Sequence, residues 1–180
     1  RMGMDVFANI DPHAKLIVVE SVWQSRHHML AGLRKHLGPI LTIANWSGEN
    51  PGLVGLLNLN GSLTKMGVKY SSIWSENFDD DYFLNGIHQW LTTGKINHDA
   101  SHVKPLANYN CGDDETSLGK ALANQVKHDL AIFGVFDEGC MGMYNAIIDD
   151  EMLNKCGIYK ERLSQSALLA EMALVTEEEA

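Results

Sequence analysis

The stretch ILTIANWSGENPGLVGLL, residues 40–57, decides the fold class. Its first five residues are apolar or β-branched, which is typical of a buried strand. Pro51 suits the first turn of a helix, where its missing N–H costs nothing. We expect this helix to end at Gly67 and to bury Leu53, Leu56, Leu57 and Leu63. A strand that leads through a short polar turn into a helix is the building unit of parallel α/β sheets.

The same alternation continues on both sides of this stretch. We expect strands at residues 16–23, 68–74 and 130–136, and helices at 26–37, 79–94, 116–128 and 140–153, with Asp79 as the cap of the second of these helices. Alternating strands and helices predict a parallel sheet covered on both faces. The sequence therefore predicts an α/β fold: a Rossmann-like open parallel sheet with helices on both faces, followed by the start of a second α/β domain.

The domain organisation follows from a polar stretch at residues 95–115, which is typical of a surface or interdomain connection. We assign residues 1–128 to a first α/β domain and residues 129–180 to the beginning of a second. The chain opens on Arg1, and it closes on Thr176 followed by acids, a pattern typical of a helix start. We therefore expect the first domain to be truncated at its N-terminus and the second at its C-terminus.

Bulk composition narrows the function classes. A formal net charge of -9 opposes binding to nucleic acid and to anionic membrane surfaces. No apolar run approaches the roughly 20 residues that a membrane helix needs. The three cysteines are odd in number and widely spaced, which favours reduced thiols in a cytoplasmic protein.

Ligands of open parallel sheets bind beyond the carboxyl ends of the strands. Trp23, Trp46 and Trp74 all lie at or just past predicted strand ends, with Glu49 and Glu76 nearby. An indole face can stack on the apolar side of a sugar ring while polar neighbours bond its hydroxyls. The alternative is that each tryptophan simply caps the sheet, and the sequence leaves both open.

A second candidate region joins the strand at 130–136 to the next helix. Asp137 and Glu138 could orient a polyol or carry a proton, or they could be acids that stabilise a helix start. The glycines here do not form GxGxxG, so a dinucleotide site has little support. His98 and His102 have helical spacing but lie in a stretch without helical periodicity, so we expect a solvated loop there.

Four stretches in this order resemble the amino-terminal half of the L-fucose isomerase family, which is related to the L-arabinose isomerases. They are residues 20–23 (ESVW), 48–52 (GENPG), 72–74 (SIW) with the acidic helix start at Asp79, and 134–149 from Gly134-Val135 to Asp149. The ordered set carries the resemblance, which spans the chain from about Leu16. Asp137 and Glu138 depart from it, because smaller residues are expected there.

The resemblance implies part of a cytoplasmic homo-oligomer, often a hexamer, that interconverts an aldose and a ketose through an enediol with Mn²⁺. The metal-holding residues of the family fall beyond Ala180, so none is assigned to this sequence. Trp23 matches a tryptophan that one subunit offers to its neighbour's site, and Met141 matches a methionine of the pocket. The candidate substrate-binding residues are Trp23, Met141, Trp46, Glu49, Glu76, Asp137, Glu138, Tyr144 and Asn145.

Two other functions are open at this point. One is a non-catalytic sugar- or nucleotide-binding α/β module. The other is a nucleotide-dependent enzyme with a degenerate phosphate loop at residues 139–142.

Overall fold

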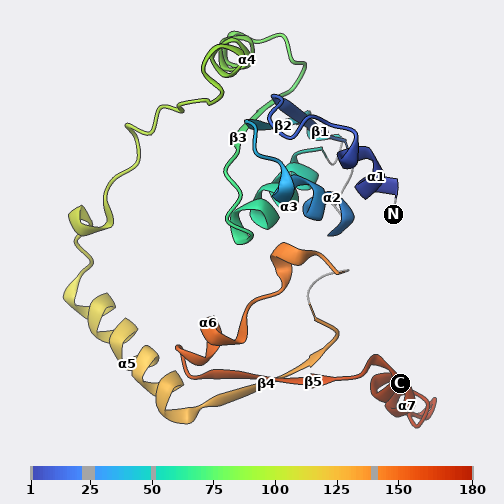
Figure 1. Ribbon diagram of the computed structural model, residues 1–180. Coiled ribbons are helices and arrows are strands. Elements are labelled where there is room, and N and C mark those ends of the chain that lie inside the picture. The colour runs from blue at the N-terminus through green and yellow to red at the C-terminus, as the bar shows by residue number, and fades with distance from the viewer. Residues whose placement is uncertain (1, 22–26, 50–51, 139–141, 180) are drawn as a thin grey trace. The chain divides into compact units, whose positions relative to one another are not determined.

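The computed structural model describes residues 2–21, 27–49, 52–138 and 142–179 (Figure 1). It divides into two compact units. Unit 1 comprises residues 1–99 with 143–145, and unit 2 comprises residues 100–142 with 146–180. Each is a mixture of helices and parallel strands, so the predicted α/β class is confirmed. The prediction that a second domain starts at residue 129 stays a prediction.

Unit 1 is built on a three-stranded parallel sheet in the order β1-β2-β3. The strands are β1 (Leu16–Glu20), β2 (Ile40–Asn45) and β3 (Ser71–Ser75), and the helices are α1 (Met2–Ala8), α2 (His27–Lys35), α3 (Gly52–Lys65) and α4 (Asp81–Thr93). Ile43 of β2 lies opposite Val19 of β1 and Ile73 of β3. Because β2 is central and covered on both sides, its first five residues are all buried.

Helices cover both faces of this sheet. On one face Leu30 and Leu33 of α2 and Leu59 and Leu63 of α3 pack with Ile40. On the other face Leu41, Ile43 and Ile73 pack with Phe83 and Trp90 of α4. The alternation of Ile40 and Leu41 between faces is the two-residue period of a strand. The predicted open parallel sheet with helices on both faces is therefore confirmed for unit 1.

Polar side chains also lie between α3 and the sheet of unit 1. Thr42 is fully buried, and its hydroxyl donates to Asn60 Oδ1 at 2.8 Å. Asn60 Nδ2 donates to Ser72 Oγ at 2.8 Å, so one amide joins the helix to two strands. Buried polar groups cost little free energy when they are hydrogen-bonded in this way.

The ends of α4 show how local sequence sets helix bounds. Its N-cap is Asp80, whose Oδ1 accepts from the Phe83 N–H at 2.8 Å, so the predicted cap Asp79 is wrong by one residue. Gly94 ends the helix with φ of 77°, and its N–H donates to the Trp90 carbonyl at 2.8 Å. A positive φ is a conformation that glycine adopts without the cost of a Cβ clash.

Unit 2 contains the parallel pair β4 (Ala131–Phe136) and β5 (Ile158–Leu163). Its helices are α5 (Asp113–Asp129), α6 (Asp150–Asn154) and α7 (Gln165–Met172), with the 3-10 turn η1 (Leu106–Asn108). A second 3-10 turn, η2 (Tyr144–Ala146), has its first two residues in unit 1 and its last in unit 2. The predicted helix at 140–153 is wrong over residues 142–149, which contain only the short turn η2, and is confirmed only over its last four residues, which lie in α6. Strand β5 and helix α7 were not predicted.

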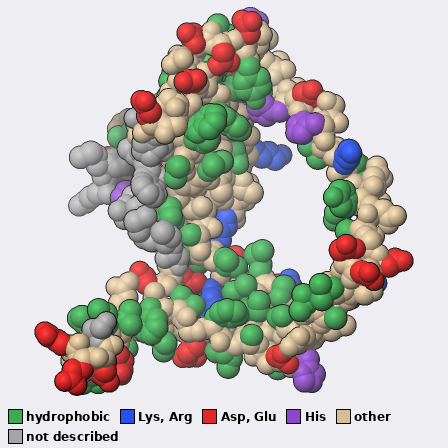
Figure 2. All heavy atoms as spheres, turned by 180° about the vertical axis from the view of Figure 1, so that it is seen from behind, with side chains coloured by type: hydrophobic (Ala, Val, Ile, Leu, Met, Phe, Trp, Pro, Cys, Tyr) green, Lys and Arg blue, Asp and Glu red, His purple; other side chains and the backbone are tan. Residues whose placement is uncertain are grey.

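No apolar side chain among the described residues of unit 2 is buried. Ile132 is 74% exposed and Phe133 is 54% exposed on neighbouring positions of β4, so both faces of the strand are open. Figure 2 shows hydrophobic side chains along the surface of this ribbon. Parallel strands in proteins are normally covered on both faces, so this pair has surface that further protein could cover.

Candidate functional site

The carboxyl edge of the unit 1 sheet is where the sequence placed a ligand. β2 ends at Asn45, whose Nδ2 donates to the Glu76 carbonyl beyond β3. The Trp46 N–H donates to the Ser75 carbonyl at 3.0 Å. These two bonds hold the chain that follows β2 against the chain that follows β3, so Trp46 and Glu76 belong to one edge.

The tryptophans at this edge are not core residues. Trp46 is 53% exposed and Trp74 is 42% exposed, whereas Trp90 in the core of unit 1 is fully buried. A tryptophan that caps a sheet would bury most of its indole against the strands below. The exposure of Trp46 and Trp74 therefore favours an aromatic surface available to a ligand over tryptophans that only cap the sheet. Trp23 lies outside the described residues.

Carboxylates and amides accompany these indoles. Glu49 and Glu76 are exposed. The Oδ1 atom of Asn45 is buried and has no hydrogen-bond donor among the described residues. Glu20, which the sequence analysis did not single out, is the last residue of β1 and pairs in register with Ala44 of β2. Its side chain is only 3% exposed. A glutamate is rarely so buried, and an acid that directly follows four apolar strand residues is the signal that could have found it.

Two further groups fix the shape of this edge. Ser75 Oγ donates to Asp80 Oδ2 and accepts from the Phe78 N–H at 2.9 Å. The Ser75 hydroxyl and the Phe83 N–H hold the pKa of Asp80 below its usual value, because both hydrogen bonds favour the charged carboxylate. Asp80 therefore stays ionised at neutral pH and anchors α4 to the end of β3.

The N-terminus of α3 approaches the same edge very closely. A Cβ added to Gly52 would lie 2.6 Å from the Asn45 carbonyl oxygen and 3.3 Å from the Glu20 carbonyl oxygen. No side chain fits in that space. Gly52 is thus the residue that lets α3 begin directly above the ends of β1 and β2.

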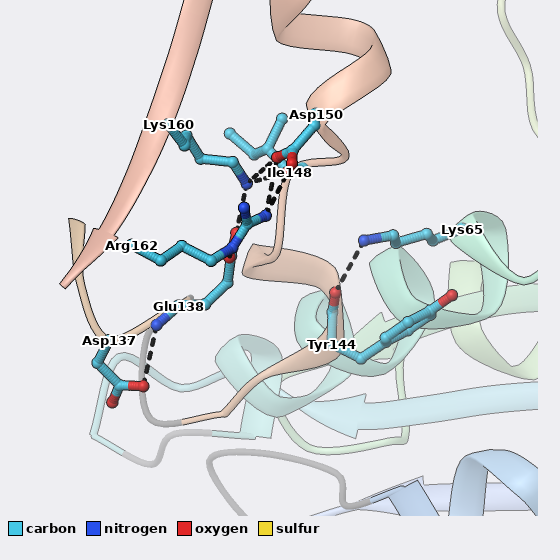
Figure 3. A network of polar contacts seen from close by, with 8 residues as sticks. All are labelled: Lys65, Asp137, Glu138, Tyr144, Ile148, Asp150, Lys160 and Arg162. Carbon is cyan, nitrogen blue, oxygen red and sulfur yellow. Dashed lines mark hydrogen bonds and ion pairs between the residues drawn. The ribbon is translucent and has the colours of Figure 1, made fainter. Parts of the chain in front are cut away.

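Asp137 and Glu138 lie in unit 2, and the structure gives them structural partners (Figure 3). Both oxygens of Glu138 are bonded: Oε1 accepts from Lys160 Nζ, and Oε2 accepts from Arg162 Nε at 2.5 Å. Asp150, the first residue of α6, accepts from the same two cations, at 3.0 Å from Lys160 Nζ and 2.9 Å from Arg162 Nη2. The four side chains form a network of zero net charge that joins the end of β4, α6 and β5.

This network decides what Glu138 can do. The hydrogen bond from Lys160, which has the larger effect, and that from Arg162 hold the pKa of Glu138 below its usual value. Lys160 Nζ also donates to the Ile148 carbonyl at 2.6 Å, so its donors are used within the network. A carboxylate with two cation partners and a lowered pKa does not carry a proton at neutral pH. The contacts that the structure gives Glu138 are those of a structural ion pair, and its role toward a polyol or a proton stays a prediction.

Asp137 has a similar role. Its Oδ1 accepts from the Glu138 N–H at 2.9 Å, and its Oδ2 accepts from Gln165 Nε2 at 2.9 Å. Gln165 is the first residue of α7, so Asp137 links the end of β4 to that helix. The helix start that the sequence suggested next to these acids is absent from the described residues 142–149, and Met141 lies outside the described residues.

Tyr144 and Asn145 pack on α3 in unit 1. Asn145 Oδ1 accepts from Asn58 Nδ2 at 2.7 Å, and Asn58 is only 4% exposed. Lys65 Nζ lies 4.6 Å from the centre of the Tyr144 ring, within the range of a cation–π contact. These contacts lie along the middle and the end of α3, from Asn58 to Lys65, and the Tyr144 ring also lies 5.8 Å from the ring of His27, the first residue of α2. The structure therefore does not bring Tyr144 and Asn145 together with Trp46, Glu49 and Glu76.

His98 and Tyr82 form a polar pair at the start of α4 that the sequence did not predict. His98 Nε2 is 2.9 Å from the Ser72 carbonyl, and its Nδ1 is 2.9 Å from the Tyr82 hydroxyl. Because a carbonyl can only accept, Nε2 carries the proton and Nδ1 accepts from Tyr82. The predicted loop at His98 is confirmed by the absence of a regular element at residues 96–99, but its fixed histidine was not foreseen.

In the part of the chain that the structure describes, no three His, Cys, Asp or Glu side chains come together as metal ligands. Over the same described residues, no helix has the length and apolarity to cross a membrane.

No protein-family model, no curated protein and no solved structure matches this chain. The resemblance to the L-fucose isomerases therefore stays a prediction that rests on the ordered motifs.

Proposed function

We propose that this chain belongs to a metal-dependent aldose–ketose isomerase of the L-fucose isomerase kind and forms part of its sugar-binding wall. One observation carries the proposal: Trp46 and Trp74 stand exposed at the carboxyl ends of adjacent parallel strands. That edge is the usual ligand position of such sheets. Exposed indoles beside carboxylates and amides suit a polyol, which has apolar ring faces and a rim of hydroxyls.

The chain's own part in the reaction is binding and enclosing the sugar. The described residues form no Mn²⁺ site, and the carboxylate of Glu138 is held by Lys160 and Arg162. In this proposal the groups that hold Mn²⁺ and pass the proton through the enediol belong to other parts of the complete enzyme. The open faces of β4 and β5 fit a chain that is completed by further protein.

The same proposal includes a cytoplasmic homo-oligomer, a hexamer by the resemblance. Cys111 and Cys156 are exposed free thiols, which suits a reducing compartment.

The test uses intrinsic fluorescence, because all four tryptophans precede residue 95 and so report on unit 1. L-Fucose and L-arabinose are titrated into the chain while iodide quenches the exposed indoles. We expect sugar to protect Trp46 and Trp74 from iodide, while buried Trp90 stays unquenched throughout. Trp46→Ala should weaken binding roughly 2- to 13-fold, which corresponds to about 0.5–1.5 kcal/mol for one aromatic contact.

The control is Tyr109→Ala, which removes another exposed aromatic ring, 70% exposed, at a position remote in sequence from the strand ends. It should leave sugar binding unchanged. Full iodide access at saturating sugar, or equal binding by a Trp46→Ala, Trp74→Ala double variant, would remove this edge from the sugar site. Sugar binding by the complete protein with no aldose–ketose conversion in the presence of Mn²⁺ would favour the non-catalytic binding module.

A further inference from the structure

The charges of unit 1 are separated between the two edges of its sheet. All the described Lys and Arg residues before residue 99 lie where a helix ends or the next strand begins, at the amino edge: Lys15, Arg34, Lys35, Lys65, Lys69 and Lys95. Most of the acids lie at the carboxyl edge: Glu20, Glu49, Glu76, Asp79, Asp80 and Asp81. Figure 2 shows acidic side chains gathered around α4, which begins at that edge. The exceptions are Asp5 in α1, Asp11 in the loop before β1 and Asp99 in the segment after α4.

Helix dipoles explain only part of this separation. Arg34, Lys35 and Lys65 lie in last helical turns and Asp81 lies in a first turn, where such charges stabilise helix ends. Lys69 and Lys95 follow the ends of α3 and α4, and so lie outside any helix. The helices therefore give no reason for those charges.

The amino edge carries a groove without acids. One depression of about 430 Å³ is lined by Arg34 and Lys69, and an adjoining one of about 360 Å³ is lined by Lys69 and Lys95. The two share Leu37, Gly38 and Ile40, so they form a continuous feature, which we call the basic groove. No Asp or Glu lines either depression, and Lys69 and Lys95 form no ion pair with a described carboxylate.

We propose that the basic groove binds the acidic carboxyl edge of a second copy of this chain, so that unit 1 associates head to tail. The loops at the two edges connect the same strands and helices. The layers of the fold therefore set the distances between the cations at one edge and between the acids at the other in the same way. Two copies stacked along the strand direction bring Lys69 and Lys95 toward Glu76 and Asp79. This proposal does not depend on the sugar-binding function.

Head-to-tail contact has two physical consequences. It uses different surfaces on the two partners, so it can continue into rings or open chains rather than stopping at a pair. It also depends on salt, because charges at an exposed edge are screened within about 10 Å at 0.1 M and within about 3 Å at 1 M salt. The association is therefore present at low salt and lost at high salt.

The test is the mass of the full chain by sedimentation equilibrium, with two charge-reversal variants. The amino-edge variant is Lys69→Glu with Lys95→Glu, and the carboxyl-edge variant is Glu76→Lys with Asp79→Lys. All four side chains are exposed, so the fold tolerates the changes. A control, Lys104→Glu with Lys120→Glu, makes the same change of charge at exposed positions in unit 2.

We expect the unmodified chain and the control to exceed the 19.9 kDa monomer mass at about 0.1 M salt and to approach it at about 1 M. Each charge-reversal variant alone places like charges at the positions where residues 69 and 95 meet residues 76 and 79, so it stays at 19.9 kDa. An equal mixture of the two variants associates again, because each edge then meets an edge of opposite charge.

Three outcomes would overturn the proposal. The first is an unmodified chain that is monomeric at low salt. If Lys69→Glu with Lys95→Glu then also lowers its melting temperature, the groove is covered by an acidic segment of the same chain and not by a second copy. The second is association that persists in both variants, which would place the contact elsewhere, such as the open faces of β4 and β5. The third is a mixture that stays monomeric although both variants are folded.

Discussion

Replacing Gly52 by alanine tests how the carboxyl edge is built. The added Cβ would lie 2.6 Å from the Asn45 carbonyl oxygen, whereas ordinary contacts begin at 3.4 Å, so α3 must retreat by about 0.8 Å. The blocking atom is backbone of the central strand β2, which is paired with β1 and β3 and cannot rotate away. We therefore take the upper part of the usual overpacking cost, about 2–3 kcal/mol.

An opposing term reduces that cost. Alanine restricts the unfolded chain more than glycine does, which stabilises the fold by about 0.4–1 kcal/mol. The net loss for Gly52→Ala is then about 1–2.5 kcal/mol in the free energy of unfolding of unit 1. For a unit of this size that lowers the melting temperature by about 4 °C or more.

Thermal and urea unfolding followed by tryptophan fluorescence measure this loss, since all four tryptophans belong to the first 99 residues. Gly119→Ala is the matched control, because a Cβ there would meet nothing within 4 Å in the exposed helix α5. The control should leave unit 1 unchanged. A Gly52→Ala protein as stable as the unmodified chain would show that α3 does not press on the strand ends, and the account of the edge would be wrong.

Three further predictions concern the core, the α4 cap and the charge network. Leu63→Ala removes a fully buried side chain and should cost about 2–5 kcal/mol in urea unfolding. Leu57, which the sequence analysis expected to be buried, is 57% exposed, so Leu57→Ala should cost far less. Equal losses would contradict the assigned faces of α3. Because the pKa of Asp80 is lowered from 3.8, its contribution to stability is complete above that value and is lost as the pH falls through the folded-state pKa. Asp80→Asn should therefore flatten the acid limb of a stability–pH profile, and an unchanged slope would exclude the Ser75 contact. Glu138→Gln should increase amide hydrogen exchange in β5, and unchanged protection there would mean that the network does not hold the strand pair.

Much of unit 1 was predictable from local patterns. The apolar run at residues 40–44 is the central strand, and Gly94 is the C-cap of α4, because strand burial and helix termination depend on neighbouring residues in the chain. The cap at Asp80 rather than Asp79 was missed by one residue, since both acids satisfy the same local rule. Only the geometry of the Ser75 and Phe83 partners distinguishes them.

Unit 2 was predicted less well for a physical reason. Its β5 strand has no buried face, and its sequence, IYKERL, therefore carries no apolar alternation that a reader of the sequence could detect. The expected helix after Glu138 followed from helix-start chemistry alone. In the structure the acid is bound by Lys160 and Arg162, which lie more than 20 residues away along the chain.

The sequence by itself determined the alternation of strands and helices, the parallel sheet and the edge at which a ligand is expected, because these depend on periodicity and on the direction of the chain. Only the tertiary structure decided which residues share that edge. It left Trp46 and Trp74 exposed, buried Glu20, placed Tyr144 and Asn145 on α3, and bound Glu138 into a neutral network. Exposure and ion pairing depend on groups distant in the chain, and no local pattern encodes them.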